Sequence, residues 1–106
     1  MMPRNNLRKL LREGKPTVGT RYSCTWPDLV EIIGNSQEFD YSEFTGQYGP
    51  YTLHDLENLA RASELTGMDA ITKIDQEPRT FIATRAIQAG FTGMLFADCR
   101  TAEDVK

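Results

Sequence analysis

The sequence predicts an α/β protein of the (β/α)₈ TIM-barrel type, in which this chain covers an N-terminal helix and about the first four β-α units. After a first helical segment, short apolar runs alternate four times with helical segments, which is typical of a parallel sheet with right-handed crossovers. The turn "RYSCTWPD" after the first run also lacks the glycine-rich phosphate loop that usually marks a doubly wound sheet. A complete barrel needs roughly 250 residues. We therefore expect residues 1–106 to be a single partial domain, the N-terminal half of a barrel, and the reading frame to continue for roughly another 150 residues beyond Lys106.

The four strands are expected where short apolar runs stand between turn residues, at 17–23, 39–44, 69–75 and 92–98. Before them, "NNLRKLLREG" predicts a short amphipathic helix with an asparagine cap and a stop at Gly14. The next helix is expected to start at Thr25, with Pro27 in its first turn and Asp28 at the capping-box position, and to end at Gly34. Its expected buried face consists of Leu29, Val30, Ile32 and Ile33.

Two further helices carry clear end signals. "TLHDLENLARASELTG" is expected to be capped by Thr52 and stopped by Gly67, and "EPRTFIATRAIQAG" to be stopped by Gly90. "TAEDVK" predicts the first turn of one more helix. The apolar positions that follow the helical period after Thr52 are Leu53, Leu56, Leu59, Ala60 and Leu65.

Composition and charge narrow the classes of partner. The formal net charge is -3 and the charges are interspersed, so there is no basic patch for nucleic acid and no polybasic segment for lipid. No run reaches the roughly 20 apolar residues of a membrane span, and the N-terminus does not read as a secretory signal. Cys24 and Cys99 lie far apart, which predicts neither a zinc site nor a disulfide framework. The expected location is therefore the cytoplasm.

One bend stands out as a candidate for chemistry. "EFTGQYGPYTLHD", from Glu43 to Asp55, places two glycines and a proline between a predicted strand and a predicted helix. Loops that follow the strands of α/β enzymes hold catalytic groups, because the strand fixes their position. Gln47 and Tyr48 lie at the centre of this bend and are candidate site residues.

Four stretches carry a resemblance to a known family: "NNLRKLLREGKPTVGT", "FDYSEFTGQYGPYTLHDLENLARA", "KIDQEP" and "IQAGFTGMLFADCRTAEDVK". In this order they resemble the N-terminal half of the HpcH/HpaI aldolase/citrate lyase family, the metal-dependent 2-oxo-acid aldolases. The similarity covers nearly the whole chain. It includes the Gly-Thr of the first strand, the Gly-Pro after the second and the Ala-Gly ahead of the fourth.

The resemblance implies a barrel that binds a divalent metal and cleaves or forms a carbon–carbon bond next to pyruvate or a similar 2-oxo acid. Family members usually carry Glu-His before the Gly-Pro, where the histidine acts as an acid or base or orients water. This chain has Gln47-Tyr48 there. The family also has an arginine at the end of the third strand, which holds the substrate carboxylate and stabilises the enolate, whereas this chain has Lys73.

The resemblance also implies a cofactor and partners. The family's metal ligands, a glutamate and an aspartate, come from later strands, so this chain is expected to supply no metal ligand by itself. Mg²⁺ or Mn²⁺ is the expected cofactor of the full-length protein. The expected partner is a small 2-oxo acid, with a homo-oligomer in the full-length form and neither nucleic acid nor membrane as a partner.

Each candidate residue has a catalytic and a structural interpretation. Lys73 is expected at the rim, where it holds a carboxylate as a point charge, forms a Schiff base with the oxo group, or is a surface lysine. Tyr48 donates a hydrogen bond to an enolate or carbonyl oxygen, or packs under the Gly49-Pro50 turn. Gln47, a candidate substrate-binding residue, binds a metal-bound water or the loop backbone.

The remaining polar candidates carry weaker signals. His54, in the first turn of a helix, has no other metal-type ligand close in sequence and is expected to be structural. Asp98 and Cys99 follow the fourth strand on the active-site side without a triad pattern. Asp75 is expected to pair with Lys73 or to cap the loop before Pro78. Trp26 is expected to pack, or else to wall the mouth of the pocket.

The favoured function is a carbon–carbon lyase (aldolase) acting on a 2-oxo acid such as a pyruvate adduct, assisted by a metal, with this chain a fragment that lacks the metal ligands. Activity of the 106-residue chain alone is not expected. The alternatives are a non-catalytic pseudoenzyme that binds a small molecule, and a half-barrel that acts as an assembly module, because an unclosed parallel sheet exposes two edges.

Overall fold

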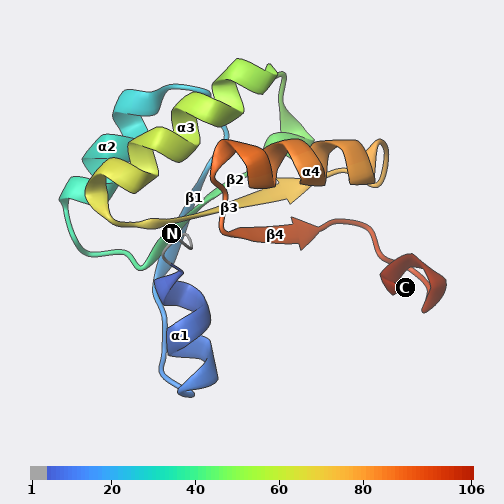
Figure 1. Ribbon diagram of the computed structural model, residues 1–106, viewed down its shortest axis with the longest axis horizontal. Helices are drawn as coiled ribbons and strands as arrows, with labels where there is room; N and C mark the ends of the chain where they lie inside the picture. Colours follow the sequence, from blue (N-terminus) through green and yellow to red (C-terminus); the bar gives the residue numbers. More distant parts are fainter. Residues whose placement is uncertain (1–4) are drawn as a thin grey trace.

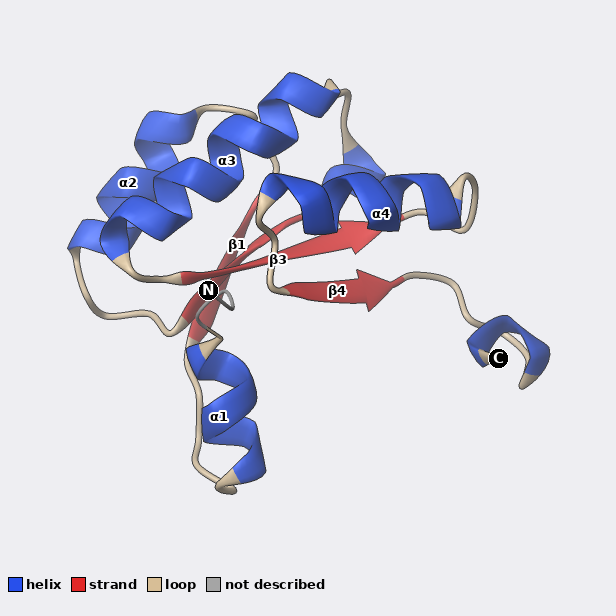
Figure 2. Cartoon of the chain, viewed as in Figure 1, coloured by secondary structure: helices blue, strands red, loops and turns tan. Residues whose placement is uncertain are grey.

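The computed structural model describes residues 5–106 and contains the predicted alternation of strands and helices (Figure 2). The four strands form one sheet in the order β1-β2-β3-β4, and all three pairs are parallel. The α/β class is therefore confirmed: three strands are each followed by an α-helix, and the fourth is followed within the described residues by a 3₁₀ turn in place of the expected α-helical turn. The elements are α1 (Asn6–Arg12), β1 (Gly19–Tyr22), α2 (Pro27–Asn35), β2 (Tyr41–Phe44), the 3₁₀ turn η1 (Gly46–Tyr48), α3 (Leu53–Thr66), β3 (Asp69–Ile74), α4 (Arg79–Ala89), β4 (Gly93–Phe96) and the 3₁₀ turn η2 (Glu103–Val105).

The helices α2, α3 and α4 lie on one face of the sheet (Figure 1). Residues of β2 and β3 that alternate toward this face, such as Phe44 and Ala70, are buried in a core formed with Val30, Leu56 and Leu59. The ring of Phe44 lies between Tyr22 and Tyr51, with ring centroids 5.6 and 5.5 Å away. A four-stranded parallel sheet with its helices on one side has the architecture of half a (β/α)₈ barrel, whose outer layer is helical.

The opposite face of the sheet is not covered by any helix of residues 5–106 (Figure 1). In β3, Thr72 and Ile74 are buried against the helices, whereas Lys73 between them points to the uncovered face, because side chains alternate along a strand. Lys73 is in register with Leu95 of β4, which is 46% exposed. This uncovered face corresponds to the interior of a closed barrel.

The helix α1 lies at the end of the sheet where the strands begin. Its cap residue Asn5 accepts a hydrogen bond from the Arg8 N–H, and its side-chain Nδ2 donates to the Thr92 carbonyl, 3.0 Å away. The Leu7 N–H donates to the carboxylate of Asp69, the first residue of β3. These bonds hold α1 beneath the sheet, far from the ends of the strands where a barrel enzyme has its active site.

The boundaries of α2 differ from the prediction. The helix begins at Pro27 with Trp26 as a cap that makes no side-chain bond, so Thr25 is not the cap. It also continues through Gly34 to Asn35. A Cβ at Gly34 would lie 2.0 Å from Thr66 Oγ1 of α3, so this glycine permits close packing of two helices and is not a stop signal.

The buried face of α2 is also narrower than expected. Val30 is fully buried, and Leu29 and Ile33 pack against the core, but Ile32 is 62% exposed. The prediction for Ile32 is wrong because the helix contacts its neighbours along one narrow stripe.

The ends of α3 agree with the sequence prediction. The Thr52 side chain accepts from the Asp55 N–H at 3.1 Å, and the Asp55 carboxylate accepts from the Thr52 N–H at 2.7 Å, which completes a capping box. Gly67 follows the helix at φ 75°. Leu56, Leu59 and Ala60 are buried as expected, whereas Leu53 and Leu65 at the two ends of the helix are exposed.

Candidate active site

The loops that follow β2, β3 and β4 meet at the end of the sheet where all four strands finish. Parallel strands bring these loops to one edge, which is where barrel enzymes place their chemistry. Two contacts between side chains join the loops: Lys73 with Tyr48, and Gln47 with Asp98. We call these four residues the rim cluster.

Lys73 and Tyr48 are held together by the 3₁₀ turn η1. Tyr48 N–H donates to the Thr45 carbonyl at 3.0 Å, and the turn carries the phenol back over the end of β3. The Lys73 ammonium Nζ lies 2.6 Å from the Tyr48 hydroxyl oxygen and 4.6 Å from the ring centroid. Gly46 permits the turn because its Cβ position lies 3.1 Å from the Tyr51 ring and 3.5 Å from the Lys73 carbonyl oxygen. Lys73 lies at the rim, as the sequence predicts, and its contact with Tyr48 is an addition from the structure.

Gln47 bridges to the loop after β4. Its Nε2 donates to Oδ2 of Asp98 at 2.9 Å, and its Oε1 is buried without a hydrogen-bond partner among residues 5–106. Asp98 has φ 57°, in the left-handed region that non-glycine residues rarely adopt. The Asp98 carbonyl also accepts from Gln76 Nε2 at 3.4 Å. Sequence reasoning had placed Asp98 on the correct side of the sheet but had not linked it to Gln47.

The other candidates lie outside this cluster. Asp75 forms no ion pair with Lys73. Burial raises the pKa of the Tyr51 phenol, and the negative charge of nearby Asp75 raises it further. His54 is exposed, with Glu57 at 3.7 Å as its only nearby acid among the described ion pairs.

Trp26 is 58% exposed, so the expectation that it packs is wrong. Cys99 is exposed, with its thiol 3.8 Å from the Phe96 carbonyl oxygen.

Arg79, at the start of α4, has a positioning role that the sequence analysis missed. Its Nη1 donates to the Asp104 carbonyl at 3.0 Å and its Nη2 donates to the Ala97 carbonyl at 2.9 Å. The guanidinium also lies over the Phe96 ring, 5.5 Å from its centroid. A cation in the first turn of a helix opposes the helix dipole, and this unfavourable placement is the sequence signal that could have indicated a tertiary role.

The residues present do not fit a divalent-metal centre by themselves. Across residues 5–106, no group of three His, Cys, Asp or Glu side chains converges closely enough to hold an ion. In the rim cluster, Asp98 is the one carboxylate, and one of its oxygens is engaged by Gln47.

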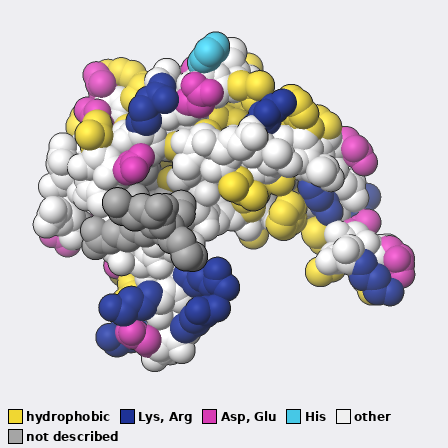
Figure 3. Space-filling model, viewed as in Figure 1, with side chains coloured by type: hydrophobic (Ala, Val, Ile, Leu, Met, Phe, Trp, Pro, Cys, Tyr) yellow, Lys and Arg dark blue, Asp and Glu magenta, His cyan; other side chains and the backbone are white. Residues whose placement is uncertain are grey.

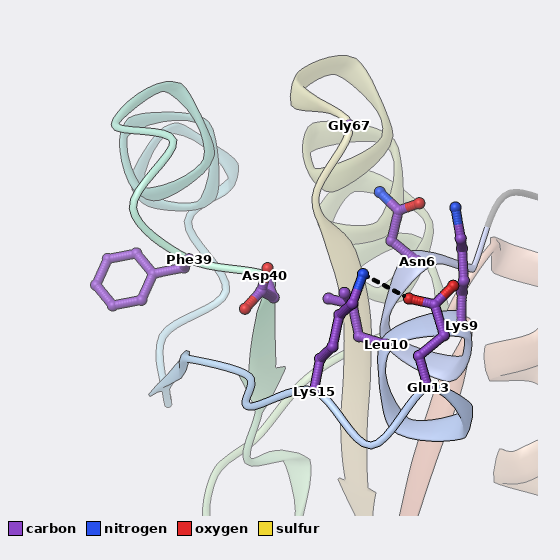
Figure 4. A pocket seen from close by; sticks show the side chains of 8 residues that line it. All are labelled: Asn6, Lys9, Leu10, Glu13, Lys15, Phe39, Asp40 and Gly67. Carbon is purple, nitrogen blue, oxygen red and sulfur yellow. Dashed lines mark ion pairs between the residues drawn. The ribbon is translucent and has the colours of Figure 1, made fainter.

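A separate cavity of about 230 Å³ lies at the opposite end of the sheet, beside α1 (Figure 4). Lys15 pairs with Glu13 at 2.8 Å on its wall, and Phe39 and Asp40, which precede β2, close another side. The end of the strands away from the active site in a barrel serves stability, so this cavity is distinct from the rim cluster.

No helix within the described part of the chain is both long and apolar enough to cross a membrane.

Comparison with known proteins gives a match in structure. No family model matches the sequence, and no curated protein matches it. An HpcH/HpaI aldolase from Desulfitobacterium hafniense is similar with a TM-score of 0.81 and 26% identity, over 93% of this chain and 38% of that one. The chain has the fold of the HpcH/HpaI aldolases. An HpcH/HpaI aldolase/citrate lyase family protein from Burkholderia cenocepacia gives the same TM-score of 0.81 at 20% identity, over 95% of this chain and 40% of its own.

The resemblance to the HpcH/HpaI aldolase/citrate lyase family is thus confirmed by similarity of structure. Macrophomate synthase is a further similar structure, with a TM-score of 0.76 at 14% identity, and it shows that the fold is shared more widely. The chain spans 38% of the length of the first HpcH/HpaI aldolase and 40% of the second. Its structural relationship is to an enzyme family of the aldolase and lyase type.

Proposed function

We propose that this chain is part of a carbon–carbon lyase that acts on a 2-oxo acid such as a pyruvate adduct, and that the rim cluster binds the substrate. The observation that carries the proposal is the Lys73–Tyr48 pair, a cation and a hydroxyl 2.6 Å apart at the end of β3. The likeness of the fold to HpcH/HpaI aldolases supports the class of reaction. The proposed full-length protein is a homo-oligomer, and its proposed location is the cytoplasm.

Lys73 supplies the positive charge in this proposal. Its ammonium lies on the uncovered face of the sheet, at the rim, where a substrate carboxylate can approach from solvent. An ammonium attracts a carboxylate as a point charge, without the two parallel hydrogen bonds that a guanidinium would give. The substrate carboxylate is therefore bound with less orientation than at an arginine.

Tyr48 supplies a hydrogen-bond donor. Because its oxygen accepts from the Lys73 ammonium, its own O–H remains available to donate to a second acceptor. When the carbon–carbon bond breaks, its electron pair moves onto the 2-oxo oxygen, and a donor at that oxygen stabilises the enolate. Gln47 holds the bend in place through Asp98.

A divalent metal, Mg²⁺ or Mn²⁺, is proposed for the full-length protein by the family resemblance, and it would polarise the 2-oxo acid. The described residues do not form its ligand set, so the roles above are those of this chain's own side chains.

Titration of the ¹⁵N-labelled chain with pyruvate tests the proposal. We expect the backbone amide shifts to move at residues 46–48 and 73–75, and Tyr48→Phe to weaken the shifts without changing their location. Shifts confined to the cavity beside α1, or no shifts at all at millimolar pyruvate, would contradict a 2-oxo-acid site at the rim.

A second candidate function, a half-barrel assembly module, is favoured by the two open edges of the sheet. Within residues 5–106 the strands β1 and β4 each pair on one side only, and Leu95 and Phe96 of β4 are both 46% exposed. Figure 3 shows apolar side chains gathered on the surface where β4 lies. Unpaired parallel edges tend to recruit another chain. Light scattering after size-exclusion chromatography tests this function, which requires a discrete dimer and is excluded by a monomer.

A further inference from the structure

The rim cluster carries two opposite charges that do not neutralise each other. Lys73 is engaged by Tyr48 and Asp98 by Gln47, and no ion pair between described residues includes either charge. Because both are held by uncharged side chains, each retains its full charge for an external group. The cluster is therefore a site with one positive and one negative pole.

The spacing of the poles follows from the chain itself. Gln47 and Tyr48 are consecutive; Tyr48 contacts Lys73 of β3, and Gln47 contacts Asp98 in the loop after the neighbouring strand β4. Neighbouring parallel strands lie about 4.8 Å apart, so the end of β3 and the loop after β4, which carry the two poles, are adjacent at the rim. A 2-oxo acid whose carboxylate is bound at Lys73 can extend along the rim toward Asp98.

The orientation of Asp98 is set by its backbone and by Gln47. Its φ of 57° places the residue in a conformation that must be held by its surroundings, and Gln47 and Gln76 provide those contacts. The reverse orientation of the Gln47 amide would direct its carbonyl oxygen at the carboxylate, so Nε2 is the atom that faces Asp98. Oδ2 is engaged, whereas Oδ1 takes no hydrogen bond from residues 5–106 and is free to accept one from a ligand.

From this geometry we infer that Asp98 determines the specificity of the site. The substrate binds with its carboxylate at Lys73 and presents to Asp98 a neutral or positively charged hydrogen-bond donor, and a second carboxylate at that end is rejected. This inference rests on the proposed function, because it takes Lys73 as the carboxylate pole. It deepens that function by naming the class of substituent distal to the 2-oxo acid.

Two ligands of the same length test the inference. 2-Oxoglutarate ends in a second carboxylate, and its terminal amide replaces that carboxylate with a neutral donor. We expect the amide to bind the ¹⁵N-labelled chain roughly two- to fivefold more tightly than 2-oxoglutarate, the range expected for one exposed charge interaction. Asp98→Asn is expected to bring the two affinities to within about 1.5-fold of each other, and the preference to shrink in 0.5 M salt.

Glu64→Gln is the matched control, because it removes the same charge from an exposed position near the C-terminal end of α3, at the far end of the sheet. It should leave the preference for the amide unchanged. If Asp98→Asn keeps the preference for the amide while Lys73→Ala weakens the binding of both ligands, the role of Asp98 is overturned. The carboxylate site at Lys73 would then still stand. Equal binding of both ligands by Lys73→Ala and the unmodified chain, or no binding at all, would overturn the carboxylate site and the inference together.

Discussion

The Lys73 ammonium donates a hydrogen bond to the Tyr48 hydroxyl at 2.6 Å and lies over the same ring, 4.6 Å from its centroid. One side chain comes from the end of β3 and the other from the turn after β2, so the contact joins that turn to the neighbouring strand. These two contacts restrict the conformations of the Lys73 side chain. The pair therefore gives the rim a positioned positive charge.

Replacement of Lys73 tests that charge. Lys73→Ala is expected to weaken pyruvate binding by about 2 kcal/mol, roughly 30-fold, because one charge-assisted hydrogen bond is lost. Lys73→Arg is expected to keep binding or improve it, since a guanidinium can hold a carboxylate with two parallel bonds. Titration followed by amide shifts measures both. Lys9→Ala, at the opposite end of the sheet, should change nothing, and equal binding by Lys73→Ala and the unmodified chain would make Lys73 a bystander.

Borohydride trapping distinguishes the two chemical roles of Lys73. A Schiff base requires a free amine to attack the oxo carbon, whereas the ammonium here is a hydrogen-bond donor to Tyr48. We therefore expect no added mass after treatment with pyruvate and borohydride, as measured by peptide mass spectrometry. A pyruvyl adduct at Lys73 would establish covalent chemistry instead.

Local signals explain how much of the fold could be predicted from the sequence. The capping box of Thr52 and Asp55 and the glycine at position 67 act within a few residues, so α3 could be placed correctly at both ends. Gly34 has the same appearance in the sequence as Gly67, but its role depends on Thr66 of another helix. The end of α2 was therefore missed.

The rim could be predicted only in part for the same reason. That Lys73 and Tyr48 share one edge follows from parallel strands and could be inferred from the order of elements. The bond between Gln47 and Asp98 joins residues 51 positions apart and depends on the left-handed backbone of Asp98, which no local pattern announces.

Gly34 offers a test of helix packing. Gly34→Ala is expected to lower the free energy of unfolding by about 1–3 kcal/mol, because the new Cβ would lie within 2.0 Å of Thr66 Oγ1 and α2 must move away from α3. Asn35→Ala is the control, since Asn35 is exposed on the same helix. Urea denaturation followed by circular dichroism measures both. A Gly34→Ala protein as stable as Asn35→Ala would show that the two helices tolerate the methyl group.

Tyr22 is expected to control stability at alkaline pH. Its side chain is buried, its hydroxyl has no well-aligned partner among residues 5–106, and burial raises the pKa of Tyr22 far above its usual value, with nearby Ser42 opposing the rise only in part. Below a pH of about 10 the phenol is neutral in both folded and unfolded chains. Above it, only the unfolded chain ionises Tyr22, so the free energy of unfolding falls by up to about 1.4 kcal/mol per pH unit.

Tyr22→Phe should therefore be close to neutral at pH 7, because it removes a buried hydroxyl that gains no hydrogen bond, and it should flatten the loss of stability between pH 10 and 11.5. Tyr51→Phe should flatten it less, because burial also raises the pKa of Tyr51 but that ring is only partly buried. Urea unfolding at a series of pH values gives the slopes. If the free energy of unfolding of Tyr22→Phe falls with pH as steeply as that of the unmodified chain, another group governs the loss of stability at alkaline pH. Tyr22 would then ionise equally in the folded and the unfolded chain.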